Sequence, residues 1–83
     1  MADLVVHELA ELQPIGQTPS TVKRLRLVRY NNDATTRLDV RSFTPGRYGW
    51  GKGVTMTRAE FEAFAAQVNE VRQAFEQHGG SAA

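Results

Sequence analysis

The chain has no cysteine among its 83 residues. Disulfide frameworks, thiolate nucleophiles and cysteine-based zinc sites are therefore excluded. It also has no apolar run approaching the ~18 residues that a membrane-spanning helix needs. Its N-terminal segment carries acidic residues where a signal peptide has a basic start. These absences predict a soluble, cytoplasmic protein with no membrane partner.

Side chains suited to catalysis are equally scarce. The two histidines, His7 and His78, lie near opposite ends of the chain, and the serines Ser20, Ser42 and Ser81 lie in no nucleophile-elbow context. No group of His, Asp and Glu residues has the spacing of metal ligands. The sequence therefore predicts a protein that is not an enzyme and that holds no metal or other cofactor.

The length and composition indicate a single small globular domain. Hydrophobic residues make up 41% of the chain and charged residues 23%, which is typical of a folded protein. We expect the domain to span residues 1–78, with residues 79–83 as a frayed tail. A chain this short buries only about 60–65% of the surface that it exposes when unfolded. Association with a second copy is the expected source of additional stability.

The net charge of +1 conceals a strong segregation of charge. Residues 1–19 carry three acidic side chains and no lysine or arginine. Residues 20–58 carry nine basic side chains against two acidic ones, and residues 59–83 carry four acidic side chains against one basic one. A basic middle between acidic ends predicts a surface that binds polyanions.

The hydrophobic pattern predicts an antiparallel sheet. Residues 22–30 and 36–43 both alternate between apolar and polar side chains, and Asn31, Asn32 and Asp33 between them are turn formers, so the two segments form a hairpin. The pattern of residues 54–57 predicts a short final strand of the sheet. Residues 4–12 fit a strand and a helix equally well, and the prolines and glycine of residues 14–19 predict a loop.

A single helix is predicted to follow the sheet. Thr57 and Glu60 have the spacing of a capping box. Phe61, Phe64, Val68, Val71 and Phe75 then recur at spacings of three and four, which places them on one stripe. The stripe is longer than one small sheet can cover. We therefore expect a homodimer whose interface is formed by four of its residues: Phe64, Val68, Val71 and Phe75.

One face of the predicted hairpin is rich in arginine. If Leu25, Leu27, Leu38 and Val40 point toward the helix, the opposite face combines basic and aromatic side chains with a single acid. The side chains of this face are Arg24, Arg26, Val28, Tyr30, Arg37, Asp39, Arg41 and Phe43. Guanidinium groups bind phosphates and aromatic rings stack on bases. An ordinary solvated face is the alternative, but it would mix both signs of charge across strands.

Residues 46–53 contain four glycines and are predicted to form a flexible loop. The spacing of Gly46, Gly51 and Lys52 matches a phosphate-binding P-loop, but Gly53 replaces the required Ser or Thr and no helix follows directly. The P-loop interpretation therefore fails. We expect the loop to act as a clamp on a nucleic-acid strand, whereas Trp50 fits a place in the core equally well. The clamp residues are Arg47, Tyr48, Trp50 and Lys52.

Several short motifs resemble a known family. Leu38-Asp39-Val40-Arg41 is followed by Phe43, by Pro45 and by residues 51–57, which open a helix. This order and spacing resemble transcriptional coactivators of the positive cofactor four type, and most closely their short bacterial members. The preceding segment 25–31 matches the second strand of that family in length and aromatic position. The resemblance covers residues 20–75, and residues 4–19 loosely.

The resemblance implies a homodimer of curved four-stranded antiparallel sheets with a C-terminal helix in the interface. It also implies binding of single-stranded DNA with little sequence preference. The strand residues that correspond to those used by the family are Arg26, Tyr30, Arg41, Phe43 and Lys52. That family commonly has tryptophan where Phe43 stands, so stacking can pass to Trp50 or Tyr48. The acidic, serine-rich extension of eukaryotic members is absent, so control by phosphorylation does not carry over.

Together these patterns predict an α+β protein with the order β-β-β-β-α that binds single-stranded DNA, or RNA, as a homodimer. The alternative is a dimeric protein-interaction module that recruits transcription machinery and touches nucleic acid only weakly. Transcription or replication proteins are further partners that both interpretations allow. The location expected is the cytoplasm of a bacterium or phage host, with association to the nucleoid left open. The predicted nucleic-acid-binding residues are Arg24, Arg26, Tyr30, Arg37, Arg41, Phe43, Arg47, Tyr48, Trp50 and Lys52.

Overall fold

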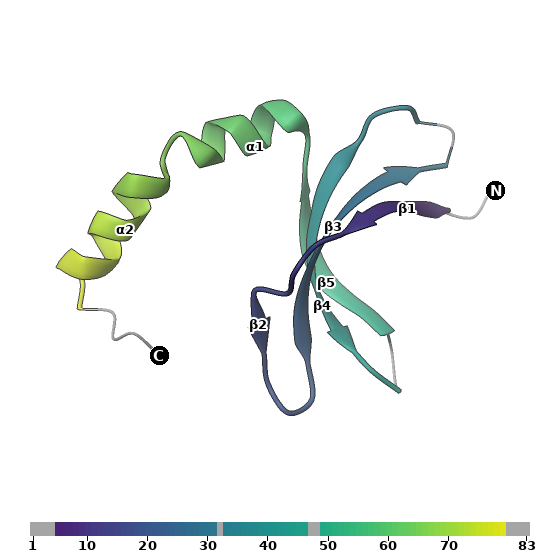
Figure 1. The fold of residues 1–83 in the computed structure, drawn as a ribbon, viewed down its shortest axis with the longest axis horizontal. Coiled ribbons are helices and arrows are strands. Elements are labelled where there is room, and N and C mark those ends of the chain that lie inside the picture. The colour runs from purple at the N-terminus through teal and green to yellow at the C-terminus, as the bar shows by residue number, and fades with distance from the viewer. Residues whose placement is uncertain (1–4, 32, 47–48, 80–83) are drawn as a thin grey trace.

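The computed structural model describes residues 5–31, 33–46 and 49–79. Within these residues the chain forms an antiparallel sheet followed by helices (Figure 1). The α+β class and the antiparallel sheet predicted from the sequence are confirmed. In chain order the elements are β1 (Val6–Glu11), β2 (Gly16–Gln17), β3 (Val22–Tyr30), β4 (Arg37–Thr44), β5 (Gly49–Met56), α1 (Arg58–Ala65) and α2 (Val68–Gln77).

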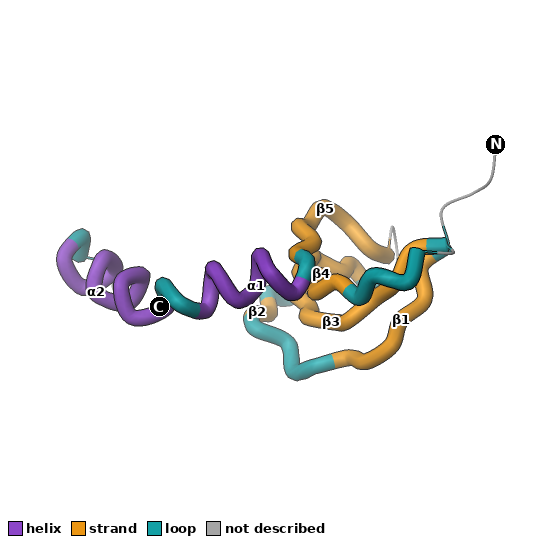
Figure 2. Tube along the Cα trace, turned by 90° about the horizontal axis from the view of Figure 1, so that it is seen from above, coloured by secondary structure: helices purple, strands orange, loops and turns teal. Residues whose placement is uncertain are grey.

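The strands lie in the order β1-β3-β4-β5, and the two-residue β2 also pairs with β3. The predicted hairpin is confirmed, since β3 and β4 pair antiparallel with Leu27 opposite Leu38. In the turn between them Asn31 has a φ of 47°, a left-handed conformation that asparagine tolerates. The sheet curls strongly without closing into a barrel, as the view along it shows (Figure 2).

The ambiguous N-terminal segment is a strand with a bulge. β1 pairs antiparallel with β3, and its register shifts between Glu8 and Ala10. A bulge inserts one extra residue and reverses the alternation of side chains beyond it. This shift is why the alternation of residues 4–12 is broken, so that a helix fits the segment as well as a strand does. The short β2 was not expected either, because it lies within the loop predicted for residues 14–19.

The glycine-rich segment is not the flexible loop that its composition predicts. Residues 49–53 belong to β5, which pairs with β4. A side chain at Gly51 would place its Cβ 2.7 Å from Ser42 Oγ, and one at Gly53 would collide with Arg41 Cβ and the Val40 carbonyl oxygen. Gly51 and Gly53 therefore allow two strands to approach each other closely, and they do not make the segment a flexible loop.

The predicted single helix is two helices. The capping box is confirmed: Thr57 Oγ1 accepts from the Glu60 N–H at 3.2 Å, and Glu60 Oε1 accepts from the Thr57 N–H at 2.8 Å. The break follows Ala65, where Gln67 Nε2 donates to the Ala63 carbonyl at 3.2 Å. That carbonyl would accept the Gln67 N–H in a continuous helix. The Gln67 N–H bonds to the Phe64 carbonyl instead, so α1 ends and α2 begins in a new direction.

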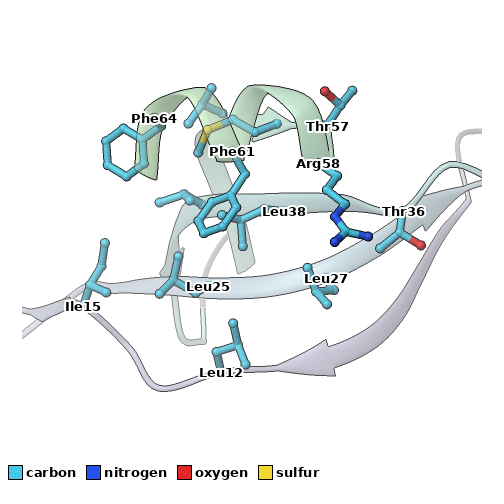
Figure 3. Close-up of a pocket in the computed structure, with 13 residues that line it drawn as sticks. Leu12, Ile15, Leu25, Leu27, Thr36, Leu38, Thr57, Arg58, Phe61 and Phe64 are labelled. Atoms are coloured by element: carbon cyan, nitrogen blue, oxygen red, sulfur yellow. The ribbon is translucent and has the colours of Figure 1, made fainter. Parts of the chain in front are cut away.

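The apolar face of the sheet lies toward α1, as predicted. Leu25 and Leu27 of β3, with Leu38 of β4, lie beneath Phe61, which points down from the helix (Figure 3). The space between them is an open apolar groove of about 850 Å³. We call it the apolar groove. Its lining also includes Leu12, Ile15, Val40, Val54, Met56 and Phe64.

The chain buries little of itself. In the part that the structure describes, Val28 is the one hydrophobic residue that is fully buried, while Phe64 and Val54 of the apolar groove remain 50% and 55% exposed. The radius of gyration is 15.2 Å, against about 12 Å for a compact domain of this length. The cause is α2, which extends away from the sheet (Figure 1).

The first prediction concerns the approach of β4 and β5. Replacing Gly53 with Ala forces a methyl group against Arg41 and the backbone of Val40, so we expect the free energy of unfolding to fall by about 1–3 kcal/mol or more. Gly16→Ala is the matched control, because its added Cβ meets only Lys23 Cβ at 3.8 Å. Urea unfolding of both variants measures the difference. Equal stability of the two variants would contradict the role given to Gly53.

Candidate nucleic-acid interface

The register of β3 and β4 brings most of the predicted arginines onto one face. Arg26 lies directly opposite Asp39, and Arg24 lies opposite Arg41. Residues two apart on a strand share a face, so this face also carries Val28, Tyr30, Arg37 and Phe43. We call it the charged face, and it is the side of the sheet opposite the apolar groove.

Asp39 is the centre of the charged face and is completely buried. Its Oδ2 accepts from Arg26 Nε at 2.8 Å, and its Oδ1 accepts from Arg41 Nε at 2.7 Å. Arg41 also donates through Nη1 to the Gly51 carbonyl at 3.0 Å. One carboxylate therefore fixes two guanidinium groups from neighbouring strands.

Two aromatic rings adjoin these arginines. Phe43 and Trp50 lie opposite each other on β4 and β5, with ring centroids 4.8 Å apart. The Arg26 guanidinium carbon lies 3.9 Å from the centre of the Trp50 ring, and that of Arg24 lies 5.2 Å from the centre of Phe43. Trp50 remains 38% exposed, so its ring packs against Arg26 and Phe43 without being buried in a core. We call these five residues around Asp39 the arginine–aromatic cluster: Arg24, Arg26, Arg41, Phe43 and Trp50.

Carboxylates from β1 join the same face. Glu8 Oε1 lies 3.4 Å from Arg26 Nη1, and Glu11 Oε2 lies 2.9 Å from Arg24 Nη1. Asp39 is the one acid that strands β3 and β4 place on this face, and β1 adds two more that the sequence pattern does not predict there. Because Arg24 and Arg41 turn toward different carboxylates, their opposed positions carry little of the repulsion that like charges would otherwise cause.

A second aromatic position lies at the other end of the charged face. The guanidinium carbon of Arg37 lies 5.7 Å from the centre of the Tyr30 ring, and Arg37 Nη1 donates to Asp33 Oδ2 at 2.9 Å. The Thr35 N–H and then the Arg37 guanidinium lower the pKa of Asp33 to about 2. This carboxylate therefore stays charged across the physiological range. Tyr30 lies about 20 Å along β3 from Arg24, at ~3.3 Å per residue.

The remaining predicted residues do not all join the cluster. Lys52 is exposed on β5, and no carboxylate of the described residues lies within ion-pair distance of it. Arg47 and Tyr48, the other predicted clamp residues, lie outside the described residues. The predicted interface residues of the helices are not buried by the chain itself, since Phe64, Val71 and Phe75 are 50%, 41% and 66% exposed.

The prediction missed the carboxylates that partner the arginines. From the sequence alone, Glu8 and Glu11 belong to an acidic end that is separate from the basic middle. Their place on the charged face depends on the bulge in β1, for which the broken alternation of residues 4–12 was the available signal.

Other kinds of site find no support in the described part of the chain. No group of three or more His, Asp or Glu side chains there is placed to hold a metal ion. No helix among residues 5–31, 33–46 and 49–79 is long and apolar enough to cross a membrane. Comparison with known protein families, curated proteins and solved structures finds no match to this chain.

The second prediction tests the buried carboxylate. Replacing Asp39 with Asn keeps the shape but removes the charge that compensates Arg26 and Arg41. Breaking a buried ion pair costs about 3–5 kcal/mol, and we expect a loss toward the lower end because Arg41 is partly exposed. Asp33→Asn breaks the exposed pair with Arg37 and should cost clearly less. Equal urea midpoints for the two variants would rule out the central role of Asp39.

Proposed function

We propose that the protein is a homodimer that binds single-stranded nucleic acid, DNA or RNA, through the charged face, with little dependence on base sequence. The observation that carries this proposal is the arginine–aromatic cluster. Two aromatic rings lie beside each other with arginine guanidinium groups over them, on a sheet face that no described helix covers. Stacking surfaces combined with phosphate donors are what an unpaired strand needs and what a duplex cannot use fully.

The half-exposed Trp50 supports base stacking. Arg26 covers one side of the indole, and the exposed part of the ring is available to a base. Stacking of a base on an aromatic side chain is worth about 1–3 kcal/mol and tolerates any base. Because Phe43 and Arg26 hold the ring in place, little conformational entropy is lost when a base stacks on it.

The ion pairs are compatible with binding of phosphates. An arginine has five N–H donors, and Asp39 engages Arg26 and Arg41 through Nε. Arg26 Nη1 bonds to Glu8 and Arg41 Nη1 bonds to the Gly51 carbonyl, so Nη2 of each guanidinium is the terminal nitrogen left for a ligand among the described contacts. The charged face is thus a preorganised set of donors rather than a surplus of positive charge.

The homodimer is supported by the surface that the single chain leaves uncovered. Its accessible surface is 6718 Å², whereas a compact protein of 9.2 kDa exposes about 4,900 Å². Exposed apolar residues of the apolar groove and of α2, among them Phe64, Val71 and Phe75, contribute to this difference. We propose that Val68, Val71 and Phe75 lie near a twofold axis, so that a second copy covers both surfaces.

A second candidate function rests on the same uncovered surface. A protein-interaction module would use the apolar groove and α2 for a different protein, such as a component of the transcription machinery. The oligomeric state decides between the two, because a stable homodimer leaves neither surface free. From the resemblance to coactivators of the positive cofactor four type we further propose a cytoplasmic protein that acts beside transcription or replication proteins.

The third prediction tests the dimer. Val71→Glu places a charge in the middle of the stripe, where burial against a second copy would be costly. We expect a monomer or an unfolded chain in sedimentation equilibrium. Gln73→Glu adds the same charge to α2 about 200° around the helix from Val71 and should remain dimeric. Dimers of native stability from both variants would exclude this placement of the axis.

The fourth prediction separates stacking from charge. Phe43→Ala should weaken binding of a single-stranded oligonucleotide by about 1–3 kcal/mol without changing its salt dependence, because stacking releases no counterions. Lys52→Ala should instead flatten the slope of log affinity against log salt by about 0.7. Fluorescence anisotropy across a salt series measures both effects.

Duplex of the same sequence is the ligand control for this experiment, and Arg72→Ala on α2 is the protein control. The wild-type protein should prefer the single strand clearly. A preference for the duplex, or indifference of binding to Phe43→Ala, would show that the charged face is not the nucleic-acid site.

A further inference from the structure

The bulge in β1 places two glutamates on the charged face. Glu8 and Glu11 are three residues apart, so regular alternation would send them to opposite sides of the sheet. The register shift between Glu8 and Ala10 reverses the alternation, and Glu11 comes to lie opposite Arg26 while Glu8 lies opposite Val28. Both therefore face the same side as the arginine–aromatic cluster. Bulges often re-aim side chains in this way.

Each glutamate holds an arginine of the proposed site. Glu11 binds the Arg24 guanidinium at 2.9 Å, and Glu8 binds that of Arg26 at 3.4 Å. Both contacts use Nη1, a terminal nitrogen of the kind that a phosphate would engage. Asp39 differs from them, because it binds Nε and is completely buried.

We infer that Glu8 and Glu11 set the affinity and ligand selectivity of the charged face by competing with phosphates for Arg26 and Arg24. This inference rests on the proposed function. In the free protein the two carboxylates satisfy the arginines. On binding, phosphates displace the carboxylates, which turn toward water, while Asp39 keeps its contacts.

The exposure of the glutamates makes this displacement feasible. Their side chains are 43% and 45% exposed, against 0% for Asp39. They belong to an edge strand that pairs with β3 alone among the described strands, so one side of β1 is open to solvent. Exposed ion pairs contribute little to stability, so giving up the pair between Glu11 and Arg24 costs the protein little. Arg26 is only 9% exposed, so the pair between Glu8 and Arg26 is the costlier one to give up.

Competition of this kind selects for polymeric ligands. A single phosphate or a mononucleotide gains one contact and loses the contact with the glutamate that it replaces. A strand presents several linked phosphates, so the later contacts form at high effective concentration. We therefore expect the charged face to ignore small anions and to bind strands that reach both Arg24 and Arg26.

The test compares Glu11→Gln, Glu8→Gln and the double variant with Glu70→Gln, which changes the net charge equally but lies on α2. The first probe is a labelled oligo(dT) of about 15 nucleotides. Each β1 variant should bind about 1.5- to 5-fold more tightly than the wild type. Its salt slope should steepen by about 0.7 for each arginine released. Glu70→Gln should change neither quantity appreciably.

Inorganic polyphosphate, titrated in parallel, separates this inference from the proposed function. Tighter binding of polyphosphate by the β1 variants, with no oligonucleotide binding by any protein, would uphold the competition and reject the nucleic-acid function. Oligonucleotide binding that Glu11→Gln and Glu70→Gln change equally would uphold the function and overturn the competition. Circular dichroism verifies the fold, and Glu11→Gln, at the more exposed pair, decides the test if Glu8→Gln unfolds.

Discussion

The buried carboxylate of Asp39 is the constraint on which the charged face depends. Two arginines from neighbouring strands converge on it, and neither could be buried to this extent without an opposing charge. Arg26, fixed in this way, supports Trp50, and Trp50 in turn packs against Phe43. Gly53 allows β5 to approach Arg41 closely. The stacking surface therefore depends on the ion pair, and the ion pair depends on the register of three strands.

The two faces of the sheet differ in whether their side chains find partners within the chain. The arginines that β3 and β4 place on the charged face, Arg24, Arg26, Arg37 and Arg41, all pair with carboxylates. Arg29 of β3 alternates to the apolar side. On the apolar face α1 covers the groove only in part, and α2 covers none of the sheet. The charged face thus resembles a preorganised binding site, whereas the apolar face resembles half of a protein core. A second copy that completes this core would leave the charged face open to a ligand.

The elements that depend on local pattern could be predicted from the sequence. The hairpin of β3 and β4, its asparagine turn and the capping box at Thr57 all follow from short-range signals, and the structure confirms them. Features that depend on contacts between distant segments could not. The glycines of β5 read as a flexible loop because only the approach of β4 explains them. The helix breaks at Gln67, where the Gln67 side chain, and not its N–H, bonds to the Ala63 carbonyl. Glu8 and Glu11 join the arginines through a bulge that leaves only a broken alternation in the sequence.

The most direct test uses the single tryptophan of the chain. Because Trp50 is the one indole present, its fluorescence reports on the arginine–aromatic cluster alone. Titration with oligo(dT) should quench this emission in step with the rise in anisotropy of a labelled strand, since stacking brings a base onto the exposed part of the ring. Duplex DNA should give little quenching at the same concentration. Saturable binding of the single strand with unchanged Trp50 emission would show that the strand binds elsewhere and would contradict the account.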